Sequence, residues 1–568
     1  MSNRRFLAAF ASVAALFAVF FYASFFFNFR TTLSEWSGSG FIWPHQLFYN
    51  FLHGRPFQSS ICATMPAGHS VGFSFNPHPY IHANVIHVNF TPYLFAYLWA
   101  LHPTAAWLYG LLFLWSLAGM ALYTRIILRR LSPRDCSPKI AFALAVLLAG
   151  GLLSVLDQMA QFLLFSGPLF MAAYECLLAR RRLAFSLLIV ALCLFSEDAA
   201  MVVATFGVAI FLFEPERRRY AWVCLGTAVP YLLLLLVVVQ PAARASLTLT
   251  EGTTTVLILK KVLHLSGSAL AANLKSMLPA LTLLPAFAAA GFLFGWPSKR
   301  DAVSIAALAV VPALPHWGES VVVGGGHHLM PPFVFTYLAL LRMLGAGSAE
   351  GSWEKSRLPP AGWAAALCFL ALSLRVSAGN LPLKLRPPLY RLAGKPEKAA
   401  ALERSLALGM ESNREIIQIA RSLPPEKSLV YWINNRATGF ITARSDLWEF
   451  PDYFDRSDYV LVQKDAIDVN YVLDRTAGGD LRSALRNTVK PNVENVPLDA
   501  ANVRLLVDTL VARERTHRIA AETGHALLLE NLHPRPFDVP PETIGFGWTR
   551  NLFRRAARSK GPATNWTF

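Results

Sequence analysis

Apolar runs of helix length recur through the first 380 or so residues of this 568-residue chain. About 20 apolar residues cross the hydrocarbon core of a bilayer as one helix. Charged residues make up only 15% of the chain, against about a quarter in soluble proteins, which excludes a string of soluble domains. We therefore expect an α-helical polytopic membrane protein with about 11 transmembrane helices. The runs lie at approximately 6–29, 104–128, 140–156, 159–179, 183–196, 199–213, 220–239, 277–296, 302–315, 331–346 and 362–377.

Basic residues predict the orientation, because loops rich in Lys and Arg stay in the cytoplasm. Threading the spans in order places every basic loop cluster on the side of Arg4, so the N-terminus is expected in the cytoplasm. The opposite side then receives the first long loop, 30–92, and everything after the last span. These clusters are Arg125–Lys139, Arg180–Arg182, Arg217–Arg219, Lys299–Arg300 and Arg342–Arg357.

The net charge of +17 is accounted for by these loops and by attraction to anionic lipid, so a nucleic-acid partner is not expected. Six cysteines show no paired spacing, which argues against a disulfide framework or a cysteine zinc site.

Two domains are expected, a transmembrane domain over 1–378 and an extracytoplasmic domain over 379–568. The second alternates charged helical stretches with short apolar segments at 428–433, 458–463 and 526–532, which is typical of a small α/β domain. It ends in a basic, weakly amphipathic tail.

Acidic residues beside apolar runs are costly to place near hydrocarbon and are therefore candidate site residues. Glu197 and Asp198 separate two runs, Asp157 follows another, and Glu35 lies in the first outer loop. Each also has a plain structural explanation, as a solvated acid or part of a hairpin at head-group level.

Histidines and glycines gather in the two long outer loops. His45, His82 and His87 lack the spacing of a metal motif, so hydrogen bonding to sugar hydroxyls or phosphate is favoured over a metal centre. Nearby aromatic residues, Tyr93 among them, are expected to stack on a sugar ring. The later loop places Gly325, Gly326, His327 and His328 just before a span, where backbone N–H groups would suit an anion, although a flexible turn explains the glycines equally well.

Five segments together resemble a bacterial multi-pass membrane family known as domain of unknown function 2079, which is grouped with the C-type (GT-C) glycosyltransferases. The segments are HQLFYNFLHGRPFQSS, HVNFTPYLFAYLWAL, FSEDAA, GGGHHLMPPFVF and RSDLWEFPDYFDRSDYVLVQ. The resemblance implies a GT-C-like fold and a glycosyltransferase of the bacterial cytoplasmic membrane. Such an enzyme moves a sugar from a polyprenyl-phosphate donor to a sugar, lipid or protein acceptor at the extracytoplasmic face.

The resemblance also has two departures. Gly40 stands where the family tends to carry an aspartate base, and Ser196 stands where it carries lysine. Glu35, Glu197 and Asp198 are therefore the candidate catalytic residues. The expected substrate contacts are His45, Gln46, His82, His87, Asn89, Asp157, Gly325, Gly326, His327, His328 and Arg444.

A divalent cation such as Mg²⁺ or Mn²⁺ would suit the carboxylates, with no metal ligand assigned. Two alternatives stay open: a transporter or flippase of a lipid-linked or polar solute, because intramembrane acids also line transport pathways, and a noncatalytic envelope assembly protein.

Overall fold

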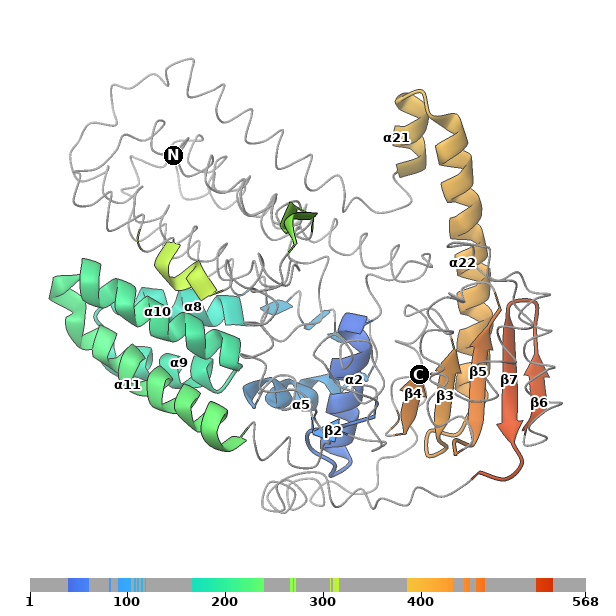
Figure 1. Cartoon of the computed structure of the whole chain (residues 1–568), viewed down its shortest axis with the longest axis horizontal. Helices are drawn as coiled ribbons and strands as arrows, with labels where there is room; N and C mark the ends of the chain where they lie inside the picture. The colour runs from blue at the N-terminus through green and yellow to red at the C-terminus, as the bar shows by residue number, and fades with distance from the viewer. Residues whose placement is uncertain are drawn as a thin grey trace.

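A computed structural model describes three parts of the chain, with α8–α11 on one side in the view of Figure 1, the sheet and α22 on the other, and α2 and α5 between them. The described residues are 39–60, 81–82, 90–103, 166–239, 386–432, 444, 446–449, 456–464 and 517–534, with short pieces within 107–118, 266–271 and 307–315.

Four consecutive helices form a bundle joined by short turns. They are α8 (Ser166–Leu178), α9 (Arg182–Cys193), α10 (Glu197–Phe213) and α11 (Arg218–Leu234), the last extended by the π-helical turn η5 (Leu235–Val239). All four lie within or beside predicted apolar runs. Among the described residues, Pro215–Val239 is the stretch long and apolar enough to cross a membrane. The total of about 11 spans stays a prediction, since the other runs lie largely outside the described residues.

Close packing holds α10 against α11. A Cβ added at Gly207 would lie 2.8 Å from Cβ of Cys224, so only glycine permits this approach. The rings of Phe185 on α9 and Tyr220 on α11 meet edge to face at 5.1 Å. The outward surface remains apolar, as at Leu187 and Trp222, which are 63% and 62% exposed. A bundle that is apolar outside as well as inside is suited to lipid.

The short turns make neighbouring helices antiparallel, and this sorts charge to the two ends of the bundle. The α8–α9 turn with Arg180–Arg182 and the α10–α11 turn with Arg217–Arg219 lie at one end. The α9–α10 turn, with Glu197 and Asp198, lies at the other. This separation is the one that the basic clusters predict, although the side of the membrane on which each end lies stays a prediction.

Part of the predicted outer loop is helical. α2 (Ser39–Leu52) precedes the strand β1 (Gln58–Ser59), which pairs antiparallel with β2 (Ile81–His82). The 3₁₀ turn η2 (Thr91–Leu94) and α5 (Phe95–Trp99) follow. Tyr93 fixes η2 on α2, because its ring lies 5.3 Å from that of Phe51 and 4.8 Å from that of Phe57.

A five-stranded sheet in the order β4-β3-β5-β7-β6 follows the helices α21 (Arg386–Leu392) and α22 (Pro396–Ser422). Its strands are β3 (Leu429–Trp432), β4 (Leu447–Glu449), β5 (Tyr459–Gln463), β6 (His517–Glu522) and β7 (Ala526–Asn531). β3 runs parallel to β4 and β5, whereas β7 is antiparallel to β5 and β6. β3, β5 and β7 lie where the apolar segments predict strands.

Both faces of the central strands are buried, which explains their continuous apolar sequences. On one face, Leu461 and Leu528 pack against Ile416 of α22. Their neighbours Val460 and Leu529 point to the opposite face, by the period of two, and are also buried. The division of the chain at residue 378 stays a prediction.

Candidate functional site

The acid pair occupies the first turn of α10. Ser196 is the N-cap residue, and its Oγ accepts a hydrogen bond of 3.0 Å from the backbone N–H of Ala199. Glu197 is half-buried and Asp198 is buried, at 8% exposure. Acids at this position are favoured by the helix dipole, by about 0.3–1 kcal/mol each. Ser196 thus supplies the acceptor that caps α10, which a lysine side chain could not do because it has no acceptor.

A hydrogen bond ties the first outer segment to this acid-bearing turn. The backbone N–H of Phe90 donates to the carbonyl oxygen of Leu194 at 3.2 Å, three residues before Glu197. Phe90 in turn meets the ring of Phe57 at 5.7 Å. Segments about a hundred residues apart are thus held at the same end of the bundle, away from its basic turns.

Gln46 on α2 is the centre of a buried polar cluster. Its Oε1 accepts from Ser59 Oγ at 2.9 Å and from Ser60 N at 3.1 Å, while its Nε2 donates to Ser60 Oγ at 2.6 Å. One helical turn along α2, Asn50 Nδ2 donates to the carbonyl oxygen of Gln58 at 2.8 Å. These bonds fold the segment after α2 back onto the helix.

His45 lies beside this cluster, with 1% of its surface exposed. Its ring packs edge to face on Trp99 at 5.3 Å, and its buried Nε2 has no hydrogen-bond partner in the described part of the chain. Burial lowers the pKa of His45 from 6.5 to about 3, so the imidazole is neutral at physiological pH.

The same segment contacts the C-terminal sheet. Ser60 Oγ donates to the carbonyl oxygen of Leu447 at 2.6 Å and accepts from the N–H of Leu447 at 3.0 Å. Gln46 Nε2 also lies 3.4 Å from the carbonyl oxygen of Arg444, and Arg55 forms a 3.4 Å ion pair with Asp446. The edge strand β4 and the turn before it are therefore held by residues from the first outer loop.

Arg444 is buried, at 4% exposure, and its guanidinium donates to three backbone carbonyls. Nη1 donates to Pro424 and Lys427 at 3.0 Å each, and Nη2 lies 3.4 Å from the oxygen of Leu423. Burial lowers its pKa to about 10, although nearby Tyr49 acts in the opposite direction. In this geometry Arg444 anchors the end of α22 to the loop before β4, and its role in substrate binding stays a prediction.

The structure brings together four of the sequence-predicted site residues in two groups. Gln46 and Arg444 meet beside β4, and Glu197 and Asp198 lie at the turn that Phe90 contacts. His45 packs on Trp99 beside Gln46, and the backbone of His82 pairs with Gln58 in the small β1–β2 sheet. The other predicted residues lie outside the described part of the chain: Glu35, His87, Asn89, Asp157, Gly325, Gly326, His327 and His328.

One expectation is wrong. Tyr93 is 3% exposed and enclosed by rings of α2 and Phe57, so it has no face to offer a sugar. The pattern that suggested a stacking platform is instead the core that fixes η2 on α2.

Sequence reasoning missed Ser59 and Ser60, which complete the Gln46 cluster, and Ser60 also contacts the C-terminal sheet. The one feature that could have pointed to Ser59 and Ser60 is their position, because these two hydroxyl residues end the first resemblance segment. Nothing in the local sequence indicates that a strand almost 400 residues away supplies a partner for Ser60.

Comparison with known proteins identifies a family. None of the curated proteins matches the chain. Among solved structures, the crystal structure of ArnT from Cupriavidus metallidurans bound to undecaprenyl phosphate is similar, with 13% sequence identity and a TM-score of 0.45 over 93% of this chain and 98% of that one. Residues 45–376, more than half of the chain, match the family described as predicted membrane protein (DUF2079), and the chain belongs to that family.

Proposed function

We propose that this membrane protein is a GT-C type glycosyltransferase that moves a sugar from a polyprenyl-phosphate donor to an acceptor at the extracytoplasmic face of the bacterial cytoplasmic membrane. The five resemblance segments support the class. The hydrogen bond from Phe90 to Leu194 is the single observation that carries the site, because it joins the first outer segment to the turn bearing Glu197 and Asp198.

The acid pair is suited to the chemistry of this transfer. An acceptor oxygen forms a bond to the anomeric carbon while the bond from that carbon to the phosphate oxygen breaks, and the phosphate leaves with the electron pair. The acceptor proton passes to a carboxylate, which acts as general base. Asp198 and Glu197 are the described candidates, and Glu35 is a third from the sequence.

The location of the pair suits a lipid-borne donor. The outer surface of the bundle is apolar along α9 and α11, and the acids lie at its end, where a lipid phosphate would meet the water boundary. Gly325, Gly326, His327 and His328 are proposed to hold the departing phosphate, and a bound Mg²⁺ or Mn²⁺ remains part of the proposal.

The test measures donor consumption by the full chain in lipid nanodiscs, using a panel of radiolabelled polyprenyl-phosphate sugars. We expect turnover by the wild type and a loss of roughly 10²–10⁴-fold in either Asp198→Asn or Glu197→Gln, the range of general-base catalysis. Glu216→Gln is the matched control, since Glu216 is an exposed acid in the η4 turn (Pro215–Arg217) at the opposite end of the bundle.

The outcomes separate the class from the site. Full turnover in Glu197→Gln, Asp198→Asn and Glu35→Gln alike would reject the acid assignment while keeping the transferase. Solute uptake into sealed vesicles without any glycosylated product would establish transport instead. Consumption of no donor in the panel, with folded protein, would favour a noncatalytic assembly role.

A further inference from the structure

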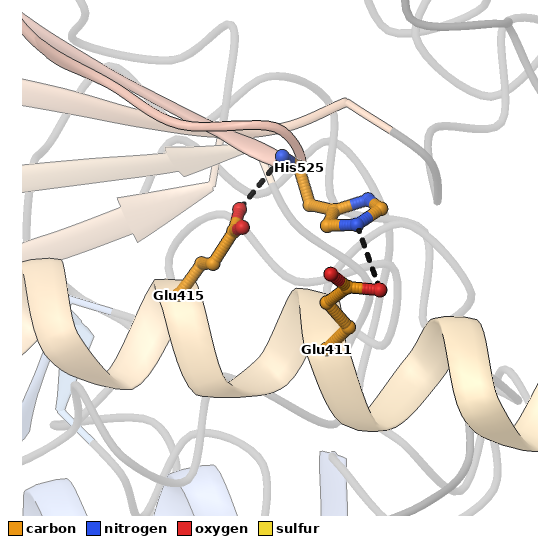
Figure 2. Close-up of side chains that lie close together, drawn as sticks. All are labelled: Glu411, Glu415 and His525. Carbon is orange, nitrogen blue, oxygen red and sulfur yellow. Dashed lines mark hydrogen bonds and ion pairs between the residues drawn. The ribbon is translucent and has the colours of Figure 1, made fainter.

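Three side chains with metal-ligand chemistry meet between α22 and the β6–β7 turn, in a place that the proposed transfer reaction does not use. Glu411 and Glu415 are four residues apart on α22 and therefore project from the same face of the helix. His525 projects toward them from the turn that joins β6 to β7 (Figure 2). One oxygen or nitrogen from each of the three lies within 4.8 Å of the others.

The separation between Glu411 and His525 fits metal coordination better than a hydrogen bond. Glu411 Oε2 and His525 Nε2 are 3.5 Å apart, which is long for a hydrogen bond between charged groups. Two ligands bound tetrahedrally at about 2.1 Å from one zinc ion are about 3.4 Å apart. A single ion placed between Glu411 and His525 would therefore satisfy both atoms with little movement.

Glu415 is held in place by the turn itself. Its Oε2 accepts from Thr523 Oγ1 at 2.6 Å and from the backbone N–H of His525 at 2.7 Å. Both bonds end on the same oxygen, which leaves Oε1 to face a cation. Hydrogen-bonded carboxylates of this kind are typical of metal sites, because the outer partner fixes the ligand.

The turn carrying His525 is itself rigidly tied to the sheet. The N–H of Lys464, after β5, donates to the carbonyl oxygen of His525 at 2.8 Å, and Lys464 Nζ donates to the carbonyl oxygen of Thr523 at 2.7 Å. Thr523 Oγ1 also accepts from Ala526 N at 3.0 Å. The imidazole is thus presented from a fixed backbone, which reduces the ordering cost of binding.

We infer that Glu411, Glu415 and His525 form a binding site for a divalent transition-metal ion of the zinc class, with water at the fourth position. One imidazole with two carboxylates suits such an ion, whereas Mg²⁺ and Ca²⁺ prefer oxygen ligands alone. The bound ion clamps α22 to the β6–β7 turn, so its role is structural and independent of the transfer reaction.

The test uses the full, untagged chain in nanodiscs after metal removal. Zn²⁺ is titrated against a chromophoric chelator, and Co²⁺ is used as a spectroscopic substitute. We expect one equivalent of Zn²⁺ and the intense visible absorption of tetrahedral Co²⁺ in the wild type. Glu411→Gln should lose both, because it removes one of the carboxylate ligands. The fold should stay intact, since the Glu411 side chain is 65% exposed.

Two further variants refine the assignment. Thr523→Val should weaken Zn²⁺ binding by roughly 10–100-fold, the usual effect of losing an outer-shell partner, and Thr523→Ser should restore it. His533→Ala is the control, since His533 follows the far end of β7, ~20 Å along the strand from His525, and should leave binding unchanged.

Hydrogen exchange gives a second readout. Zn²⁺ should slow exchange across 523–526 in the wild type and have no such effect in Glu411→Gln, because only the bound state is stabilised. Equal Zn²⁺ affinity in wild type and Glu411→Gln would overturn the inference. Absence of any bound Zn²⁺ at micromolar concentration would also overturn it, and would leave Glu411 and His525 as an ordinary ion pair.

Discussion

The hydroxyl of Ser60 both donates to and accepts from the backbone of Leu447, at 2.6 and 3.0 Å. Leu447 begins β4, the strand at the edge of the sheet, so a serine from the first outer loop satisfies backbone groups that an edge strand otherwise leaves unpaired. The outer loop and the C-terminal sheet are therefore one connected structure, and the loop segment that holds Gln46 is positioned from both sides.

The first prediction concerns this contact. Ser60→Ala removes both bonds and leaves Gln46 Nε2 without its closest partner, a loss of about 1–3 kcal/mol in the local opening free energy. Amide exchange at Leu447 should accelerate by roughly ten- to a hundredfold. Ser186→Ala is the control, because the Ser186 hydroxyl donates within its own helix to Arg182. Unchanged exchange at Leu447 would show that the contact is not made in solution.

The second prediction concerns His45 and pH. Burial lowers its pKa from 6.5 to about 3 in the folded protein, whereas the unfolded chain binds the proton near pH 6.5. Stability from the neutral imidazole is therefore complete above pH 6.5 and declines as the pH falls from there toward 3. In His45→Phe, the number of protons taken up on unfolding should fall by up to one in this pH range.

Hydrogen exchange of α2 at several pH values measures the effect of His45. A slope equal to wild type in His45→Phe would mean that the imidazole is accessible to protons in the folded state.

The third prediction concerns Asp458, which joins the starts of β5 and β3. Burial alone would raise the pKa of Asp458, but hydrogen bonds from Ser428 and Lys427 outweigh burial and hold the pKa below its ordinary 3.8. The stabilisation is therefore present above pH 3.8 and is lost as the pH falls through the lower, folded value.

Asp458→Asn should accordingly speed exchange in β3 at pH 7, by the equivalent of about 1–3 kcal/mol, and the difference from wild type should narrow below pH 3.8. Glu426→Gln, at a neighbouring exposed position, should have no such effect. If the difference in β3 exchange between Asp458→Asn and wild type stays constant as the pH falls, the charge of the Asp458 carboxylate is not responsible for the stabilisation.

The fourth prediction concerns Arg444. Its planar guanidinium reaches three carbonyls from two nitrogens, which the single ammonium of lysine cannot reproduce. Arg444→Lys should destabilise the end of α22 by about 2 kcal/mol, measured by exchange across 420–429, whereas Arg404→Lys on the exposed face of α22 should be neutral. If Arg444→Lys leaves exchange across 420–429 unchanged, the guanidinium is not needed to hold the end of α22 and is free to serve in substrate binding.

The sequence predicts an element best where a single environment, lipid or the protein interior, surrounds it. The apolar runs predict α8–α11 closely, because lipid requires an apolar surface of fixed length whatever the helix contacts. The strands β3, β5 and β7 are also predictable, since burial on both faces demands continuous apolar sequence. β4, with three residues, and the polar edge strand β6 carry no such pattern.

The site is only partly predictable. Glu197 and Asp198 stand out because an acid beside an apolar run has an unfavourable free energy of insertion. That signal can be read from the neighbouring residues alone. The contacts of Gln46 with the carbonyl of Arg444 and of Ser60 with Leu447 join segments almost 400 residues apart, which no local pattern encodes. Arg444 is an expected substrate contact because it lies in one of the resemblance segments, and its hydrogen bonds to three carbonyls could not be read from that segment.

The central claim is that the acid-bearing end of the bundle and the outer segment share the extracytoplasmic side, opposite the basic turns. It is tested by replacing all six cysteines and introducing single cysteines for labelling of intact cells with a membrane-impermeant maleimide. Exposed positions are available on both sides, with His53 and His533 expected outside and Arg181 and Glu216 inside. We predict that His53→Cys and His533→Cys react in intact cells, and that Arg181→Cys and Glu216→Cys react only after permeabilisation. Labelling of Arg181→Cys together with His53→Cys from the outside would contradict the account.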